Sequence, residues 1–110
     1  MASRDITIVQ EQNYPITIRV DGVDLADGGS TKVVTGTLRN IITGTETSIT
    51  SSATVVTSTG DPSYFTWTPE ESAQALDAGL YAVQWAFTDS ASVREYTRHW
   101  DKVFITEKIQ

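Results

Sequence analysis

The segment 77–89 restricts the fold of this chain more than any other part of the sequence. Large apolar residues occupy every second position in its centre, separated by alanine or glutamine; they are Tyr81, Val83, Trp85 and Phe87. Successive side chains of a strand point to opposite faces, so this alternation places all four on one side. Asp77, Ala78 and Gly79 just before them are typical of a turn. We therefore predict a central strand of an all-β domain, with these four side chains in the core.

The rest of the chain also favours short strands separated by turns. Alternating apolar residues predict strands near 6–10, 14–20, 31–42, 64–68 and 93–106, the last one interrupted near 99–101. The segment 46–59 is rich in Ser and Thr and predicts a further strand, with Ala53 and Val55 facing inward. Pro69, followed by two glutamates, predicts one short helical turn near residues 69–77. About seven strands with regular turns are typical of a β-sandwich or a small barrel.

Length, charge and cysteine content restrict the class of protein. The 110 residues are the size of one compact domain, which we expect to span 1–110. The absence of Cys excludes disulfides, thiolate metal sites and cysteine nucleophiles. A formal net charge of −6 disfavours nucleic-acid binding, because basic side chains must displace counterions from phosphates. The first residues hold no apolar run typical of a signal peptide, and we expect synthesis in the cytoplasm and no membrane contact.

Residues that could support catalysis or metal binding lack the required neighbours in sequence. His99 is the only histidine, and no Gly-x-Ser-x-Gly motif accompanies it. Glu70 and Glu71 are adjacent, so on a helix they point in different directions and do not face each other as a glycosidase pair must. We therefore predict that the protein is not an enzyme and uses no cofactor or small-molecule substrate.

The turn-rich segment 21–30 raises the question of a cation site. It carries Asp21, Asp24 and Asp27 among glycines, but the spacing does not fit the calcium-binding loop of EF-hands. Turn chemistry accounts for Asp and Gly in such a loop without a metal. We favour that interpretation and expect no metal site, although the sequence leaves cation binding by residues 21–27 open.

Aromatic residues near the C-terminus are candidates for a partner surface. Trp100 lies among charged residues, and Phe104 falls on the opposite face from Val103 and Ile105. Large outward aromatics on a small domain often mark an interface. We also expect the terminal segments 1–5 and 107–110 to order on a partner. The predicted interface residues are Trp100, Phe104, Arg98, Ile105 and Ile109.

Several segments together resemble a known family of domains. They are ITI at 6–8, YPITIRVDG at 14–22, Leu25, YFTWTP at 64–69, DAGLYAVQW at 77–85 and VFIT at 103–106. In this order they are similar to the immunoglobulin-like β-sandwich domains of tailed-bacteriophage virion proteins, such as the N-terminal domain of baseplate upper proteins and small neck, head-fibre and tail components. The resemblance covers nearly the whole chain and implies an immunoglobulin-like antiparallel β-sandwich.

The resemblance implies assembly rather than catalysis. We expect a structural component of the virion, at the neck, tail or baseplate, whose copies form a symmetric homo-oligomer and dock onto a neighbouring virion protein. A capsid decoration or head-fibre protein is the alternative within the same class. From another class, a carbohydrate-binding or adhesion module is the alternative, and an exposed aromatic platform would distinguish it.

Overall fold

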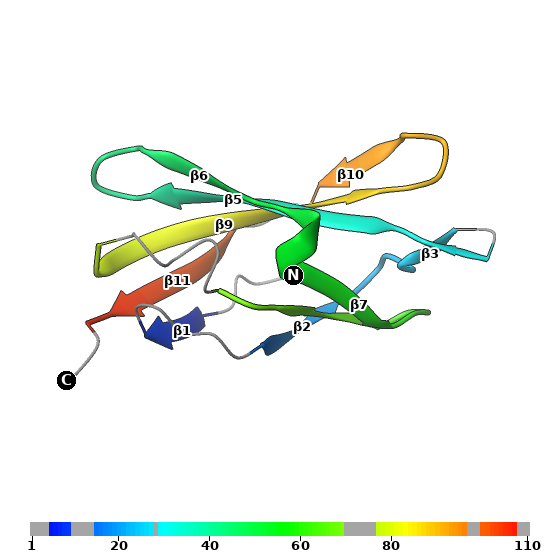
Figure 1. The fold of residues 1–110 in the computed structure, drawn as a ribbon, viewed down its shortest axis with the longest axis horizontal. Coiled ribbons are helices and arrows are strands. Elements are labelled where there is room, and N and C mark those ends of the chain that lie inside the picture. The colour runs from blue at the N-terminus through cyan, green and yellow to red at the C-terminus, as the bar shows by residue number, and fades with distance from the viewer. Residues whose placement is uncertain (1–4, 10–14, 28, 70–76, 97–99, 108–110) are drawn as a thin grey trace.

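Two β-sheets pack face to face and enclose the core of the protein. The structure, a computed structural model, describes residues 5–9, 15–27, 29–69, 77–96 and 100–107, and Figure 1 shows their arrangement as an elongated molecule. The large sheet has the order β1-β11-β9-β5-β6, with β10 also paired to β9, and the small sheet has the order β2-β8-β7. The predicted all-β sandwich is therefore confirmed.

The strands of the large sheet are β1 (Asp5–Val9), β5 (Val33–Asn40), β6 (Glu46–Ile49), β9 (Gly79–Thr88), β10 (Arg94–Tyr96) and β11 (Asp101–Thr106). Those of the small sheet are β2 (Ile16–Val20), β7 (Thr54–Ser58) and β8 (Ser63–Trp67). A short hairpin of β3 (Ala26–Asp27) and β4 (Ser30–Thr31) and a 3₁₀ turn, η1 (Ser51–Ala53), complete the elements of the described residues.

Strand β9 occupies the centre of the large sheet, as its alternation predicts. It pairs with β5 along one edge, and with β11 and then β10 along the other. Its four large side chains are all buried, from Tyr81 to Phe87. β10 ends at Tyr96 and β11 begins at Asp101 along the same edge of β9. The predicted interruption of the last strand is confirmed at Trp100, which lies in neither strand, while 97–99 lie outside the described residues.

The sheet order is that of an immunoglobulin-like sandwich. In that fold the third, sixth and seventh strands share one sheet, and the second, fourth and fifth share the other. Here β5, β9 and β11 lie in the large sheet, whereas β2, β7 and β8 form the small one. The hydroxyl of Tyr81, near the start of β9, donates a hydrogen bond to the backbone oxygen of Asp77 (2.9 Å). This is the contact called a tyrosine corner in such domains.

Aromatic rings fill the space between the two sheets. The ring of Trp85 from β9 makes edge-to-face contacts with Phe65 (centroids 4.9 Å apart) and Trp67 (5.5 Å), both from β8. Gly36 of β5 lies opposite Trp85 in the strand register, and a Cβ at that position would lie 2.8 Å from Trp85 Cε3. The missing side chain of Gly36 therefore makes room for the indole.

One buried carboxylate lies at the start of β11. Asp101 is buried, and one of its carboxylate oxygens accepts a hydrogen bond from the indole nitrogen of Trp85 (3.2 Å). A buried acidic group needs such partners, because burial in apolar surroundings disfavours its charge. The contact links the central strand to β11 and fixes the indole orientation.

The structure corrects the prediction for the segment 46–59. It is not one strand: β6 belongs to the large sheet, β7 belongs to the small sheet, and η1 connects them. Ala53 is buried as predicted, but it lies in η1, whereas Val55 is 60% exposed rather than inward. The Ser/Thr-rich segment offers little contrast between its two faces, so its register depends on its partners.

Two further features differ from the prediction or lie beyond it. The sandwich is not wholly antiparallel, because β1 pairs parallel with β11. The helical turn predicted near residues 69–77 falls largely on 70–76, which lie outside the described residues. The two main sheets contain more described strands than the seven predicted, because two predicted strands are each divided into two. The segment 46–59 forms β6 and β7, and the segment 93–106 forms β10 and β11.

Candidate docking surface

The alternation of β11 separates core residues from surface residues. Val103 and Ile105 point into the core, while Lys102, Phe104 and Thr106 are exposed. The outward position predicted for Phe104 is confirmed, with 38% of its surface exposed. Ile105 is only 3% exposed, so its predicted place among the interface residues does not fit this structure. Its side chain packs within the core cluster instead.

Phe104 lies within a group of apolar residues from four neighbouring segments. It pairs with Leu80 of β9, whose carbonyl oxygen accepts a hydrogen bond from the N–H of Ile41 (3.2 Å) just after β5. Ile42 follows in the turn and is 90% exposed. On β1, Phe104 pairs with Thr7, and Val9 lies two residues further along the same outward side, where it pairs with Thr106. We call these residues the Phe104 patch: Val9, Ile41, Ile42, Leu80 and Phe104.

Charged residues border the Phe104 patch. One row of paired residues crosses the outer face of the large sheet beside it, in the order Asp5, Lys102, Ala82, Arg39 and Glu46. Arg39 and Glu46 form an ion pair (3.7 Å) with each side chain about half exposed. An apolar centre with a charged rim is the arrangement found in many protein interfaces.

Sequence analysis missed most of the Phe104 patch, although signals for it exist. The consecutive Ile41 and Ile42 precede the turn at 43–45, so strand alternation cannot bury both. In β1, inward Ile6 and Ile8 place Val9 on the outer side. The joining of these residues into one surface depends on strand pairing, which the sequence pattern does not specify.

The other predicted contact residues are placed only in part. Trp100 is half-buried just before β11, whereas Arg98 and Ile109 lie outside the described residues, as does His99. Asp5 and Glu107, the described ends of the two terminal segments, are exposed. Because β1 and β11 run parallel, the chain enters this edge of the sheet at one end and leaves it at the other. Asp5 and Glu107 therefore lie at opposite ends of the β1–β11 pair, while 1–4 and 108–110 lie outside the described residues.

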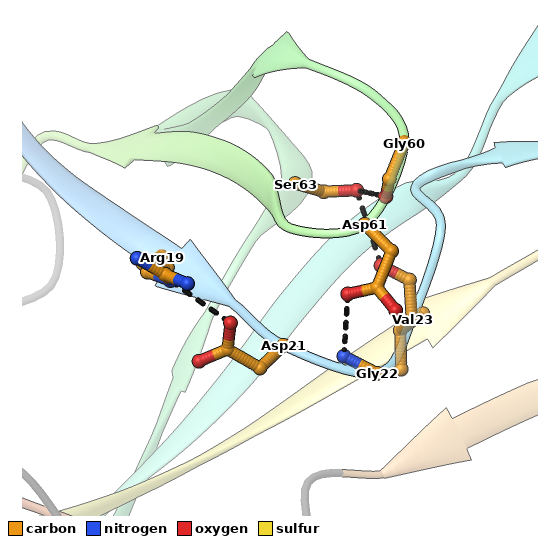
Figure 2. Close-up of polar contacts among 7 residues, drawn as sticks. All are labelled: Arg19, Asp21, Gly22, Val23, Gly60, Asp61 and Ser63. Atoms are coloured by element: carbon orange, nitrogen blue, oxygen red, sulfur yellow. Dashed lines mark hydrogen bonds and ion pairs between the residues drawn. The ribbon is translucent and has the colours of Figure 1, made fainter.

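The carboxylates of Asp21, Asp24 and Asp61 bind the protein itself. Figure 2 shows Asp61 accepting a hydrogen bond from the N–H of Gly22 (2.9 Å), and Arg19 pairing with Asp21 (2.9 Å). One oxygen of Asp24 accepts bonds from the N–H groups of Gly60 (2.8 Å) and Ala26 (2.9 Å). These bonds lower the pKa of Asp24, the Gly60 bond most, because they stabilise the charged carboxylate.

Ser63 completes the connection between the loop after β2 and the loop before β8. Its buried hydroxyl oxygen accepts a hydrogen bond from the N–H of Leu25 (3.1 Å) and lies against the carbonyl oxygens of Val23 and Gly60 (Figure 2). The interpretation of this loop as turn chemistry thus has a specific structural basis. In the ranges that the structure describes, no group of three or more His, Cys, Asp or Glu residues is arranged to hold a metal ion.

Comparison with known proteins adds no family assignment. Protein-family models, curated proteins and solved structures give no match to this chain. Among the described residues there is also no helix long and apolar enough to cross a membrane.

Proposed function

We propose that this protein is a non-enzymatic structural component of a tailed-phage virion, and that it docks onto a neighbouring virion protein through the Phe104 patch. The observation that carries the docking role is this exposed apolar group, formed by four segments and bordered by a row of charges. The particle context rests on the resemblance of segments 6–8, 14–22, 64–69, 77–85 and 103–106, together with Leu25, to virion sandwich domains.

The physical argument for docking concerns the water around the patch. Covering exposed apolar surface is favourable by roughly 25 cal/mol per Å². The centres of protein interfaces contain few charged residues and many aromatic ones. The Phe104 patch has this composition, because Phe104 pairs with Leu80 beside Ile41. The charged row along one border of the patch, with Asp5 and Lys102 at one end and Arg39 and Glu46 at the other, would select a partner with complementary charges.

The rigidity of the patch also favours this role. Leu80 belongs to the central strand β9, and Phe104 belongs to β11, which is held between β9 and β1. A surface held on paired strands loses little conformational freedom on binding. Repetition of such a contact by symmetry would hold a particle together even if each contact is weak.

The test is incorporation into particles. Phe104→Asp places a charge in the centre of the patch, whereas Thr17→Asp adds the same charge to an exposed position of β2 on the other sheet. We expect Phe104→Asp to reduce the amount of protein in purified particles by about tenfold or more, because the charge would be desolvated in the interface. The control variant should be incorporated like the unmodified protein. Thermal unfolding of both isolated variants checks that they are folded.

Imaging of particles with labelled protein would give its position and symmetry together. Label at the neck, tail or baseplate fits the proposal, whereas label over the capsid surface favours the decoration or head-fibre alternative. Normal incorporation of Phe104→Asp would contradict docking through the patch. Glycan binding that is lost in Phe104→Ala, with no particle association, would instead favour a carbohydrate-binding module.

A further inference from the structure

Strands at the edges of a sheet expose unpaired backbone groups, and proteins usually protect them with charges, prolines or irregularities. Among the described strands, the small sheet ends in β2 and β7, and the path of the large sheet ends in β1 and β6. Three of these four edges are protected by a charged residue, a proline or both. Pro15 precedes β2, which also carries Arg19, while β1 begins with Asp5 and β6 begins with Glu46.

The edge strand β7 differs from the other three. The sequence from 47 to 60 contains no charged residue and no proline, and β7 itself reads Thr-Val-Val-Thr-Ser. Val55 is 60% exposed on its outer side, whereas Thr54 is buried and Val56 packs against the core. Its one irregularity is a shift in pairing with β8 between Val56 and Ser58. Residues 54–56 therefore present a short uncharged stretch with high β propensity at the sheet edge, in which the N–H of Thr54 is already bonded to the carbonyl oxygen of Ser51.

We infer that β7 is the site at which a second copy of this chain binds, by antiparallel pairing of β7 with β7 across a two-fold axis. The pairing would join two three-stranded small sheets into one continuous sheet. It would also place the exposed Val55 side chains of the two copies on the same face, where β-branched residues of neighbouring strands contact each other. This inference rests on the symmetric homo-oligomer that the family resemblance implies, and not on docking through the Phe104 patch.

The composition of the β7 edge argues for a second copy as the partner, because this strand is self-complementary and brings no charged side chain against its own copy. Each copy carries a formal net charge of −6, so two copies repel each other over most relative orientations. The uncharged β7 edge is where they can approach with the least repulsion. A two-fold axis also requires a surface that is complementary to itself. The strand β7 contains only Val, Thr and Ser, so pairing it with its own copy brings no charged side chains together. The pairing closes on itself and does not continue into a filament, because it uses the same edge of both copies.

The absence of cysteine allows a direct test with single-cysteine variants of the full chain. Val55→Cys and Thr57→Cys place thiols on β7, and Val33→Cys places one at a comparably exposed position of β5 in the other sheet. In a two-fold pair, the residues closest to the axis meet their own copies and are within disulfide reach. We expect one of the two β7 variants to form a disulfide dimer about tenfold faster than Val33→Cys, because pairing raises the effective thiol concentration.

Sedimentation of the protein without cysteine provides the second measurement. We expect a concentration-dependent dimer that Val55→Lys dissociates, because the substitution places one ammonium group of each copy on the same face of the joined sheet, close to the axis. Val33→Lys should leave the dimer intact. Phe104→Asp should also leave it intact, which separates this inference from docking through the Phe104 patch. A chain that stays monomeric at millimolar concentration, or equal disulfide rates at positions 33, 55 and 57, would overturn the inference.

Discussion

Replacement of Gly36 by alanine tests whether the central strand packs as the structure indicates. The backbone of Gly36 is in β5, directly opposite Trp85 in β9, and the space above it is filled by the indole. An added Cβ would lie 2.8 Å from Trp85 Cε3, 3.0 Å from Cζ3 and 3.3 Å from Ile49 Cδ1. Carbon atoms pack best at about 3.5–4.0 Å, so the indole would have to move by a sizeable fraction of an ångström.

The surroundings of Trp85 resist such a movement. The side chain is almost fully buried, with Phe65 and Trp67 against it, and its indole nitrogen is bonded to Asp101. Overpacking of this kind costs about 1–3 kcal/mol. Alanine in a strand regains about 0.5–1 kcal/mol relative to glycine, because it restricts the unfolded chain. The difference of these two terms is about 0–2.5 kcal/mol. Because the added Cβ would lie only 2.8 Å from a well-held indole, we expect Gly36→Ala to lie in the upper part of this range and to lower the free energy of unfolding by about 1–2 kcal/mol. For a domain of this size, that corresponds to a melting temperature lower by about 5–15 °C.

Urea unfolding followed by tryptophan fluorescence and circular dichroism measures the effect. The matched variant is Gly36→Ala combined with Trp85→Phe, because the smaller ring leaves room for the new methyl group. We expect the double variant to be more stable than the sum of the two single changes predicts, by about 1 kcal/mol. A neutral or stabilising Gly36→Ala, or strict additivity in the double variant, would refute the close packing of Gly36 against Trp85.

Two further predictions concern polar contacts. Tyr81→Phe should lower the free energy of unfolding by about 1 kcal/mol, because the hydrogen bond to Asp77 is lost. Tyr96→Phe, at an exposed position, should have little effect. Equal effects of the two substitutions in urea unfolding would contradict this role of the Tyr81 hydroxyl. The pKa of Asp24 is lowered in the folded state, so its carboxylate adds stability above its unfolded-state pKa and loses it as the pH falls through the folded-state pKa. We therefore expect the difference in free energy of unfolding between the unmodified protein and Asp24→Asn to shrink as the pH is lowered from about 6 to about 2. A difference that grows on acidification would contradict the bonds from Gly60 and Ala26.

The candidate docking surface was only partly predictable. Phe104 followed from the alternation of β11, since Val103 and Ile105 had to share the core face. The same alternation also argued against Ile105 as a contact residue. Ile41 and Leu80 could not be joined to Phe104 from sequence, because they meet only through the pairing of β11 with β9 and the backbone bond from Ile41 to Leu80.

The amino-acid sequence by itself determined which side chains each regular strand buries. In β1, β2, β8, β9 and β11, the contrast between apolar and polar neighbours is strong, and a slip of one residue would expose the apolar face to water. Only the tertiary structure decided how the segment 46–59 is divided between the two sheets, because its Ser, Thr and Val residues provide no such contrast. It also decided the parallel pairing of β1 with β11, because the choice of strand partners depends on contacts between residues far apart in the chain. The core was therefore encoded locally, whereas the Phe104 patch and the β7 edge arise from how the two sheets are assembled.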